Sequence, residues 1–172
     1  MPSAGERRTA YALTGALVLG IDLLTKALVE TLSHPHRALP VVGDWIQLRL
    51  VYNPGAAFGF HLGPWSRWIF LAIAVGAMLL LTRMAFQTPP ADRFRLVALG
   101  LVAGGAAGNL VDRVRSPQGV VDFLDLGIGA LRWPTFNVAD IGVAGGAITL
   151  AISFWLEDAR RTRAAPGPST SA

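Results

Sequence analysis

Cysteine is absent from the chain, and histidine is scarce. The lack of cysteine excludes disulfide bonds, thiolate nucleophiles and cysteine-based metal sites together, and it leaves the redox compartment undetermined. His34 and His36 are two residues apart, with no acidic residue or third histidine close by in the sequence. We therefore expect ordinary loop histidines there and no metal site.

Charged residues are sparse as well, at 15% of the chain, against 52% hydrophobic residues and a mean hydropathy of +0.47. This balance excludes a typical soluble domain and indicates a membrane protein. The formal net charge is +4, and the arginines stand in short clusters beside apolar runs. Such clusters orient membrane helices against an anionic cytoplasmic leaflet, a role that fits them better than nucleic-acid binding.

Four apolar runs are long enough to cross a bilayer, so the sequence predicts an all-α integral membrane protein with one domain, residues 1–163. The expected spans are residues 10–32, 66–83, 94–112 and 138–157. The first run follows Arg7 and Arg8 like the core of a signal peptide, but its apolar pattern continues beyond Asp22, which favours an uncleaved helix. Residues 164–172 are rich in Pro, Gly, Ser and Thr and are expected to be disordered.

The longest polar connection is expected to hold a small β-sheet at about residues 40–62. Hydrophobic and polar residues partly alternate from Trp45 to Asn53, which predicts a half-buried strand followed by a turn. A second strand, Ala56–His61, would return as a hairpin, so that the sheet forms a cradle on the membrane surface. Gly55 is expected to support the turn through a positive φ.

Two charges interrupt the first span, and small residues crowd the third. Asp22 and Lys26 stand four residues apart, so they can pair on one helix face. A structural pair is favoured, and a direct part in chemistry stays open. The glycines and alanines between Gly100 and Gly108 favour close helix packing, and they could also clear room for a substrate strand.

Carboxylates gather where the third and fourth spans meet the segment between them. A carboxylate at a bilayer edge is costly unless it is paired or faces a wet cavity, so each one is a candidate functional residue. Asp112 can pair locally with Arg113, which favours a support role. We expect Asp122 to face Asp140 as a catalytic pair. Spacing alone leaves Asp125 open as the partner, because either residue could simply face water.

Carboxylates are also what remains for peptide hydrolysis in a sequence without cysteine, ligand-spaced histidines or a convincing Ser–His–Asp set. Two aspartates within a hydrogen bond of each other share one proton, so their pKa values split. The ionised partner can take a proton from an attacking water while the protonated partner donates to the scissile carbonyl. The alternative is a transporter or proton relay using Asp22, Lys26 and Asp140, which predicts charges spread across the bilayer depth. A non-catalytic scaffold would leave the acidic cluster unexplained.

Five motifs lie in order between the expected spans: DLLTK at 22–26, NPGAAF at 53–58, GNLVDR at 108–113, VVDF at 120–123 and FNVAD at 136–140. In this order the chain resembles the lipoprotein signal peptidase family, also called signal peptidase II, over everything but the tail. The resemblance implies a bacterial aspartic endopeptidase of the membrane with Asp122 and Asp140 as the catalytic residues. The substrate-binding residues that it implies are Asn53, Asn109, Arg113 and Asn137, and the supporting residues are Asp22, Lys26, Gly55 and Asp112.

The resemblance also implies the substrate, a prolipoprotein with a diacylglyceryl-modified cysteine, cut on the amino side of that cysteine. The lipid tails would stay in the membrane lipid, and neither a metal nor an organic cofactor is implied. Four spans place both termini on one side of the bacterial inner membrane, and the arginines in the shorter segments favour the cytoplasmic side. We therefore expect the acidic site at the extracytoplasmic face, no nucleic-acid partner, and a monomer.

Overall fold

The computed structural model describes residues 4–33, 37–55 and 60–164. Within these ranges four helices are long and apolar enough to cross a membrane, which confirms the predicted architecture. They are α1 (Ala4–Leu32), α2 (Ser66–Gln87), α3 (Arg93–Arg115) and α4 (Val138–Ala164), and a short 3-10 turn, η2 (Gly63–Trp65), leads into α2. The tail expected to be disordered lies, apart from Ala164, outside the described residues, and so do His34 and His36.

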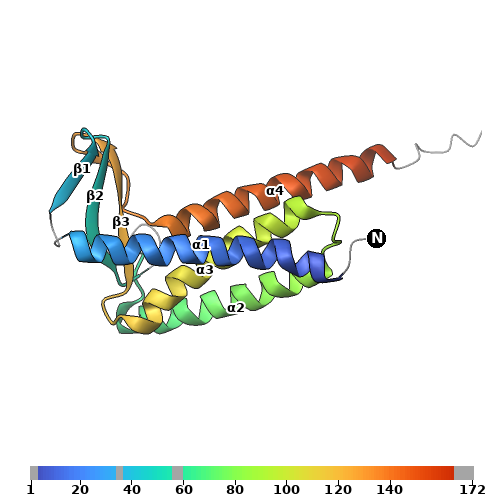
Figure 1. The fold of residues 1–172 in the computed structure, drawn as a ribbon, viewed down its shortest axis with the longest axis horizontal. Helices are drawn as coiled ribbons and strands as arrows, with labels where there is room; N and C mark the ends of the chain where they lie inside the picture. Colours follow the sequence, from blue (N-terminus) through green and yellow to red (C-terminus); the bar gives the residue numbers. More distant parts are fainter. Residues whose placement is uncertain (1–3, 34–36, 56–59, 165–172) are drawn as a thin grey trace, which may run out of the picture.

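The helices run alongside one another, and all strands gather at one end of them (Figure 1). The described start of α1 and the end of α4 lie at the opposite end (Figure 1). α3 is the central helix, because α1, α2 and α4 all pack against it. Large apolar side chains such as Leu13, Leu17, Leu24 and Leu28 on α1 stay exposed, as expected for a face that contacts lipid tails rather than water.

The small residues of α3 bring its backbone against two neighbouring helices. A Cβ atom added to Gly104 would lie 2.5 Å from the carbonyl oxygen of Gly15 in α1. One added to Gly105 would lie 2.3 Å from the carbonyl oxygen of Ala139 in α4. These distances leave no room for a side chain, so the predicted packing role is confirmed at both glycines.

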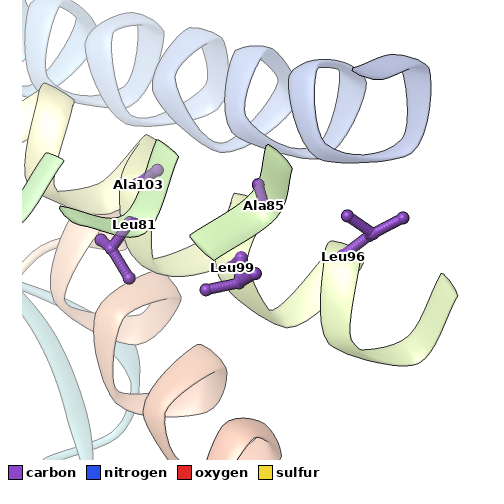
Figure 2. Close-up of a cluster of buried hydrophobic side chains, with 5 residues drawn as sticks. All are labelled: Leu81, Ala85, Leu96, Leu99 and Ala103. Carbon is purple, nitrogen blue, oxygen red and sulfur yellow. The ribbon is translucent and has the colours of Figure 1, made fainter. Parts of the chain in front are cut away.

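An apolar cluster joins α2 to α3 (Figure 2). Leu81 and Ala85 of α2 pack on Leu96, Leu99 and Ala103 of α3. Leu96 and Leu99 are completely buried. This cluster lies away from the strands, and it fixes how the two helices cross.

The sheet has four antiparallel strands in the order β1 (Ala38–Val42), β2 (Ile46–Asn53), β3 (Val120–Ile128) and β4 (Leu131–Arg132). β2 matches the predicted strand. The predicted return strand does not match: Phe60 and His61 are not in a strand, residues 56–59 lie outside the described ranges, and β2 pairs instead with β1 and β3. β1 contains Pro40, which an edge strand tolerates.

The pairing of β2 with β3 positions the acidic segment. Val51 stands opposite Asp122, and Asn53 stands opposite Val120. Directly paired residues of neighbouring strands share a face of the sheet, so Asn53 and Asp122 project to the same side. An isolated bridge between Leu124 and Phe136 then brings the segment before α4 against β3.

Candidate active site

A cavity of about 820 Å³ lies between the sheet, the segment 133–136, the end of α3 and the first turns of α4. Five of the six residues that the sequence assigned to catalysis or substrate binding line it: Asn53, Asn109, Arg113, Asp122 and Asp140. The sixth, Asn137, is fully buried and bonds to three of them. The fold therefore brings together side chains from β2, α3, β3 and α4.

Asp122 projects from β3 and is only 3% exposed. Its Oδ2 accepts a hydrogen bond from the Asn53 side-chain amide at 3.0 Å, and its Oδ1 accepts one from the Asn137 amide at 2.7 Å. Burial raises the pKa of Asp122 to about 7, and the charge of Asp140 raises it as well, whereas the two amide hydrogen bonds lower it. The carboxyl group can therefore gain or lose its proton near neutral pH.

Asp140 belongs to a reciprocal cap at the start of α4. Its backbone N–H donates to Oδ1 of Asn137 at 2.9 Å, and the backbone N–H of Asn137 donates to Oδ2 of Asp140 at 3.2 Å. This is the capping-box arrangement, with the acidic residue three positions after the cap. The N-terminus of a helix stabilises negative charge, so the bonds around Asp140 suit an ionised carboxylate.

The side-chain amide of Asn109 links Asp140 to Asn137 and to Lys26. Its side-chain Nδ2 donates to Oδ1 of Asp140 at 2.8 Å. Its Oδ1 accepts from Lys26 Nζ at 3.0 Å and from the Asn137 amide at 3.0 Å. Because two donors occupy the oxygen, the amide of Asn109 is held with its nitrogen toward Asp140.

A completely buried ion cluster lies beside these amides. Lys26 Nζ is 2.6 Å from Asp22 Oδ2 and 2.8 Å from Asp112 Oδ2, and all three side chains are 0% exposed. The predicted pair of Asp22 with Lys26 is thus confirmed. Asp22 Oδ1 also accepts from the backbone N–H of Ala139, and Asp112 Oδ2 accepts from that of Val121. The cluster therefore holds the backbone next to Asp140 and next to Asp122.

The expected pairing of Asp112 with Arg113 is wrong. Asp112 Oδ1 pairs with Arg115 Nε at 2.9 Å, because residues three apart on a helix share a face and adjacent residues do not. Arg113 turns toward the cavity instead, where its guanidinium donates to the carbonyl of Gly55 at 2.9 Å and to that of Asn109 at 3.1 Å. It thereby ties the turn after β2 to α3.

Gly55 is required for a different reason from the one expected. It is not among the described glycines with a positive φ. A Cβ atom at Gly55 would instead lie 2.2 Å from the carbonyl oxygen of Phe60, so only a residue without a side chain fits. The backbone N–H of Gly55 also donates to Asn53 Oδ1 at 3.0 Å, which orients that side chain toward Asp122.

Asp125 does not face water, contrary to the possibility that spacing left open for Asp122 or Asp125. It is 2% exposed and pairs with Arg132 at 2.8 Å and with Arg49 at 3.1 Å. It stands three positions after Asp122 in the strand, and residues at an odd offset project to opposite faces of β3. Asp125 accordingly lies outside the cavity lining.

Sequence reasoning missed several supporting residues. Glu30 accepts from Arg115 at 2.9 Å and from the Tyr52 hydroxyl at 3.3 Å, which links α1, α3 and β2. Its position four residues after Lys26 places it on the same face of α1, and this spacing was the available signal. Arg67 at the start of α2 binds the carbonyls of Arg113 and Val114, the last turn of α3. Nothing in the sequence indicated that contact.

No cluster of three or more His, Cys, Asp or Glu side chains able to hold a metal ion occurs in the part of the chain that the structure describes. The acidic residues of the site are bound by amides, a backbone N–H or basic side chains. The expectation that no metal takes part stays a prediction.

Comparisons with known proteins point to one family. The family model for signal peptidase (SPase) II matches residues 14–156. A lipoprotein signal peptidase of Xanthomonas campestris pv. campestris is 39% identical over 157 residues, which cover 90% of this chain and 93% of the relative. One of Rhodococcus jostii is 42% identical over 158 residues, which cover 88% of this chain and 75% of the relative.

The fold has solved counterparts as well. A bacterial membrane enzyme structure determined by the in meso method at 2.3 Å superposes with a TM-score of 0.80 at 27% identity, covering 91% of this chain and 93% of the other. A second, at 1.9 Å, superposes with a TM-score of 0.74 at 28% identity, covering 84% and 91%. The chain belongs to the signal peptidase II family of aspartic membrane peptidases.

Proposed function

We propose that this chain removes signal peptides from diacylglyceryl-modified prolipoproteins, cutting on the amino side of the lipidated cysteine with Asp122 and Asp140 as a catalytic pair. One observation carries the proposal. Asn137 donates from its side chain to Asp122 and from its backbone to Asp140, so a single residue holds both carboxyl groups at one cavity. Relatives named lipoprotein signal peptidase supply the class of substrate.

The environments of the two carboxyl groups support different protonation states. Asp122 is buried in the sheet and has its pKa raised to about 7, so it is the partner that holds the proton. Asp140 accepts from Asn109 Nδ2 and from the backbone of Asn137 at a helix N-terminus, so we assign it the role of the base that takes a proton from water. Pairs of carboxyl groups whose environments separate them in this way act as acid and base.

The proposed reaction has two steps, addition of water to the scissile carbonyl and collapse of the tetrahedral diol. Asp140 takes a proton from water as the water oxygen bonds to the scissile carbonyl carbon, and Asp122 gives its proton to the carbonyl oxygen. Collapse of the resulting tetrahedral diol breaks the C–N bond. Asp140 passes its proton to the leaving amine, and Asp122 recovers one from a hydroxyl of the diol. Both aspartates return to their starting states.

The substrate would lie extended across the amides at the rim of the cavity. A helical scissile bond has its carbonyl already occupied, so the cut requires local unwinding. Asn53, in the last position of β2, carries both a donor and an acceptor, as a strand-pairing contact needs. Asn109 and Arg113 extend the polar side of the cavity, and we assign them to positioning the substrate backbone.

The position of the cavity also supports an orientation in the membrane. Residues of β2 and β3 line it, so it lies at the strand end, whereas the described start of α1 and the end of α4 lie at the other end (Figure 1). Arg160, Arg161 and Arg163 near the end of α4 favour a cytoplasmic location there. The site would accordingly face the extracytoplasmic side, where lipidated precursors emerge.

The transporter alternative receives no support from the positions of the charges. It needs ionisable groups spread over the depth of the membrane. Asp22, Lys26 and Asp112 instead form one closed cluster directly beside the cavity. Their acceptor and donor atoms are turned toward each other and toward the site.

The test is to incubate the purified protein with one prolipoprotein in lipidated and in unlipidated form and to measure the product masses. We expect cleavage of the lipidated form alone, with a product that begins at the modified cysteine. The Asp140→Asn variant is the matched control and should yield no product. Cleavage elsewhere, or equal cleavage of both forms, would contradict the proposal.

A further inference from the structure

The cavity extends from Asp122 and Asp140, the proposed catalytic dyad, into the membrane-embedded part of α4. Besides Asp140, its lining includes Ile141, Val143, Ala144 and Gly145 of that helix, and we call these four residues the inner arm. α4 runs away from the strands (Figure 1). At 1.5 Å of rise per residue, Gly145 lies about 7 Å farther along the helix than Asp140. The inner arm therefore lies deeper in the bilayer than the scissile bond.

Three glycines follow one another closely in α4, and their surroundings differ. A Cβ atom at Gly142 would lie 2.8 Å from Val18 Cγ1, and one at Gly146 would lie 2.6 Å from Val102 Cγ2. Both positions thus need glycine for packing against neighbouring helices. A Cβ atom at Gly145 would meet nothing within 4 Å. A glycine inside a helix lowers helix stability relative to alanine, and at Gly145 no packing contact in the described structure explains it.

We propose that Gly145 sets the width of the inner arm, and with it the size of the apolar substrate group that lies below the dyad. This inference rests on the proposed function. Two membrane-embedded apolar parts of a lipidated precursor can reach this depth, namely an acyl chain on the cysteine and an aliphatic side chain of the signal helix. Both are recognised by the same chemistry, an open apolar wall formed by Ile141, Val143 and Ala144.

The chain offers a matched control for a substitution at Gly145. Gly76 in α2 is an exposed helix glycine, a Cβ atom there would also meet nothing within 4 Å, and it does not line the cavity. Gly145→Leu and Gly76→Leu therefore add the same side chain to a membrane helix at positions where its Cβ atom meets no neighbour. Only the first of them places that side chain in the cavity.

The experiment measures kcat and KM of both variants, and of Gly145→Ala, with one lipidated prolipoprotein in one detergent. We expect Gly145→Leu to lower kcat/KM by about tenfold or more, mainly through KM, since added or removed bulk in an apolar pocket has effects of this size. Gly145→Ala should fall between this variant and the wild type. Gly76→Leu should match the wild type, and thermal midpoints should show that all variants are folded.

Two substrate series identify the group that occupies the inner arm. If shorter acyl chains restore cleavage by Gly145→Leu, the group is an acyl chain; if smaller signal-peptide side chains restore it, the group belongs to the signal helix. Equal kinetics of Gly145→Leu and Gly76→Leu would overturn the inference, and so would a loss that neither series reduces. If the wild type cleaves no lipidated substrate, the proposed function itself fails, and that result is separate from these.

Discussion

Asp22 and Asp122 are both buried aspartates at the strand end of the molecule, yet they have different kinds of partner. Asp22 lies against the ammonium group of Lys26, and neither side chain is exposed at all. Asp122 is held by the neutral amides of Asn53 and Asn137, and it lines the cavity. Both kinds of partner favour the charged form of a carboxylate, but neutral amides carry no net charge, and at Asp122 burial outweighs them and raises the pKa to about 7.

The comparison separates the carboxylates to which we assign support from the two that we propose as reactive. Burial alone does not distinguish them, since Asp22, Asp112 and Asp125 are buried as well. Each of those three has a lysine or arginine within 3.1 Å. Asp122 and Asp140 have amide and backbone donors instead. The predictions below test this distinction.

The largest effect is expected at the dyad. Asp122→Asn and Asp140→Asn should each lower kcat by at least about a thousandfold, because asparagine keeps the shape but cannot exchange a proton. Single-turnover cleavage with folded protein measures the loss. Asp125→Asn is the control and should retain measurable activity. An inactive Asp125→Asn variant beside an active Asp122→Asn variant would reverse the assignment.

A large effect on stability, without a change of mechanism, is expected at the ion cluster. Asp22→Ala removes one partner of Lys26 and the acceptor of the Ala139 N–H, and breaking a buried pair costs about 3 kcal/mol or more. Denaturation in detergent measures this change. Arg161→Ala, which removes an exposed pair with Glu157, should change stability little. If Asp22→Ala stays as stable as the wild type and shifts the pH profile, the cluster takes part in the chemistry.

An intermediate effect is expected at the turn after β2. Asn53→Ala should lower turnover by about ten- to a hundredfold, because it removes a positioning contact but leaves both aspartates in place. Gly55→Val should also lower turnover, since its Cβ would collide with the carbonyl of Phe60. Turnover of both variants in one detergent, after a check of folding, provides the measurement. If Asn53→Ala turns over substrate at the wild-type rate, the turn after β2 has no role in positioning the substrate.

A smaller and graded effect is expected from pH. The pKa of Asp122 is raised to about 7, so its carboxyl group is protonated below that pH and loses the proton above it. If the proton on Asp122 is required, kcat/KM should fall by about tenfold per pH unit on the alkaline side. The hydrogen bond from Asn53 lowers this pKa, so Asn53→Ala should move the alkaline limb to higher pH. If the alkaline limb of Asn53→Ala stays at the wild-type pH, a group other than Asp122 causes the pH dependence.

No effect is expected from metal chelators. The two aspartates are held by amides and a backbone N–H, so removal of divalent ions should leave turnover unchanged. Activity that disappears with a chelator and returns with zinc would overturn the carboxylate mechanism.

The sequence was sufficient for the spans, because each one is a long apolar run. It was also sufficient for β2, whose partial alternation is visible, and for the five motifs that meet at the site. β3 was not recognised, since VVDFLDLGI lacks the alternation of a half-buried strand and its first four residues are all buried. Its pairing with β2 joins segments that are far apart in the chain, and no local pattern encodes such a contact.

The partners of individual charges could not be predicted either. Asp112 stands beside Arg113 in the sequence but pairs with Lys26 and Arg115 in space. The role of Gly55 depends on a carbonyl five residues later. The reciprocal cap at the start of α4 does have a signal in the sequence: Asn137 is followed three residues later by Asp140, ahead of an apolar run.

The cap at the start of α4 determines when the site can form during synthesis and membrane insertion. The orientation of Asp140 depends on the first turn of α4, because its bonds with Asn137 exist only when that turn is helical. During synthesis β3 and Asp122 emerge before α4, so a chain that is still being inserted holds only one of the two aspartates that we propose as catalytic. If the proposed pair is correct, activity requires the last span, when α4 packs against the glycines of α3. A partly inserted chain would then be inactive, and peptide hydrolysis would begin only after insertion is complete.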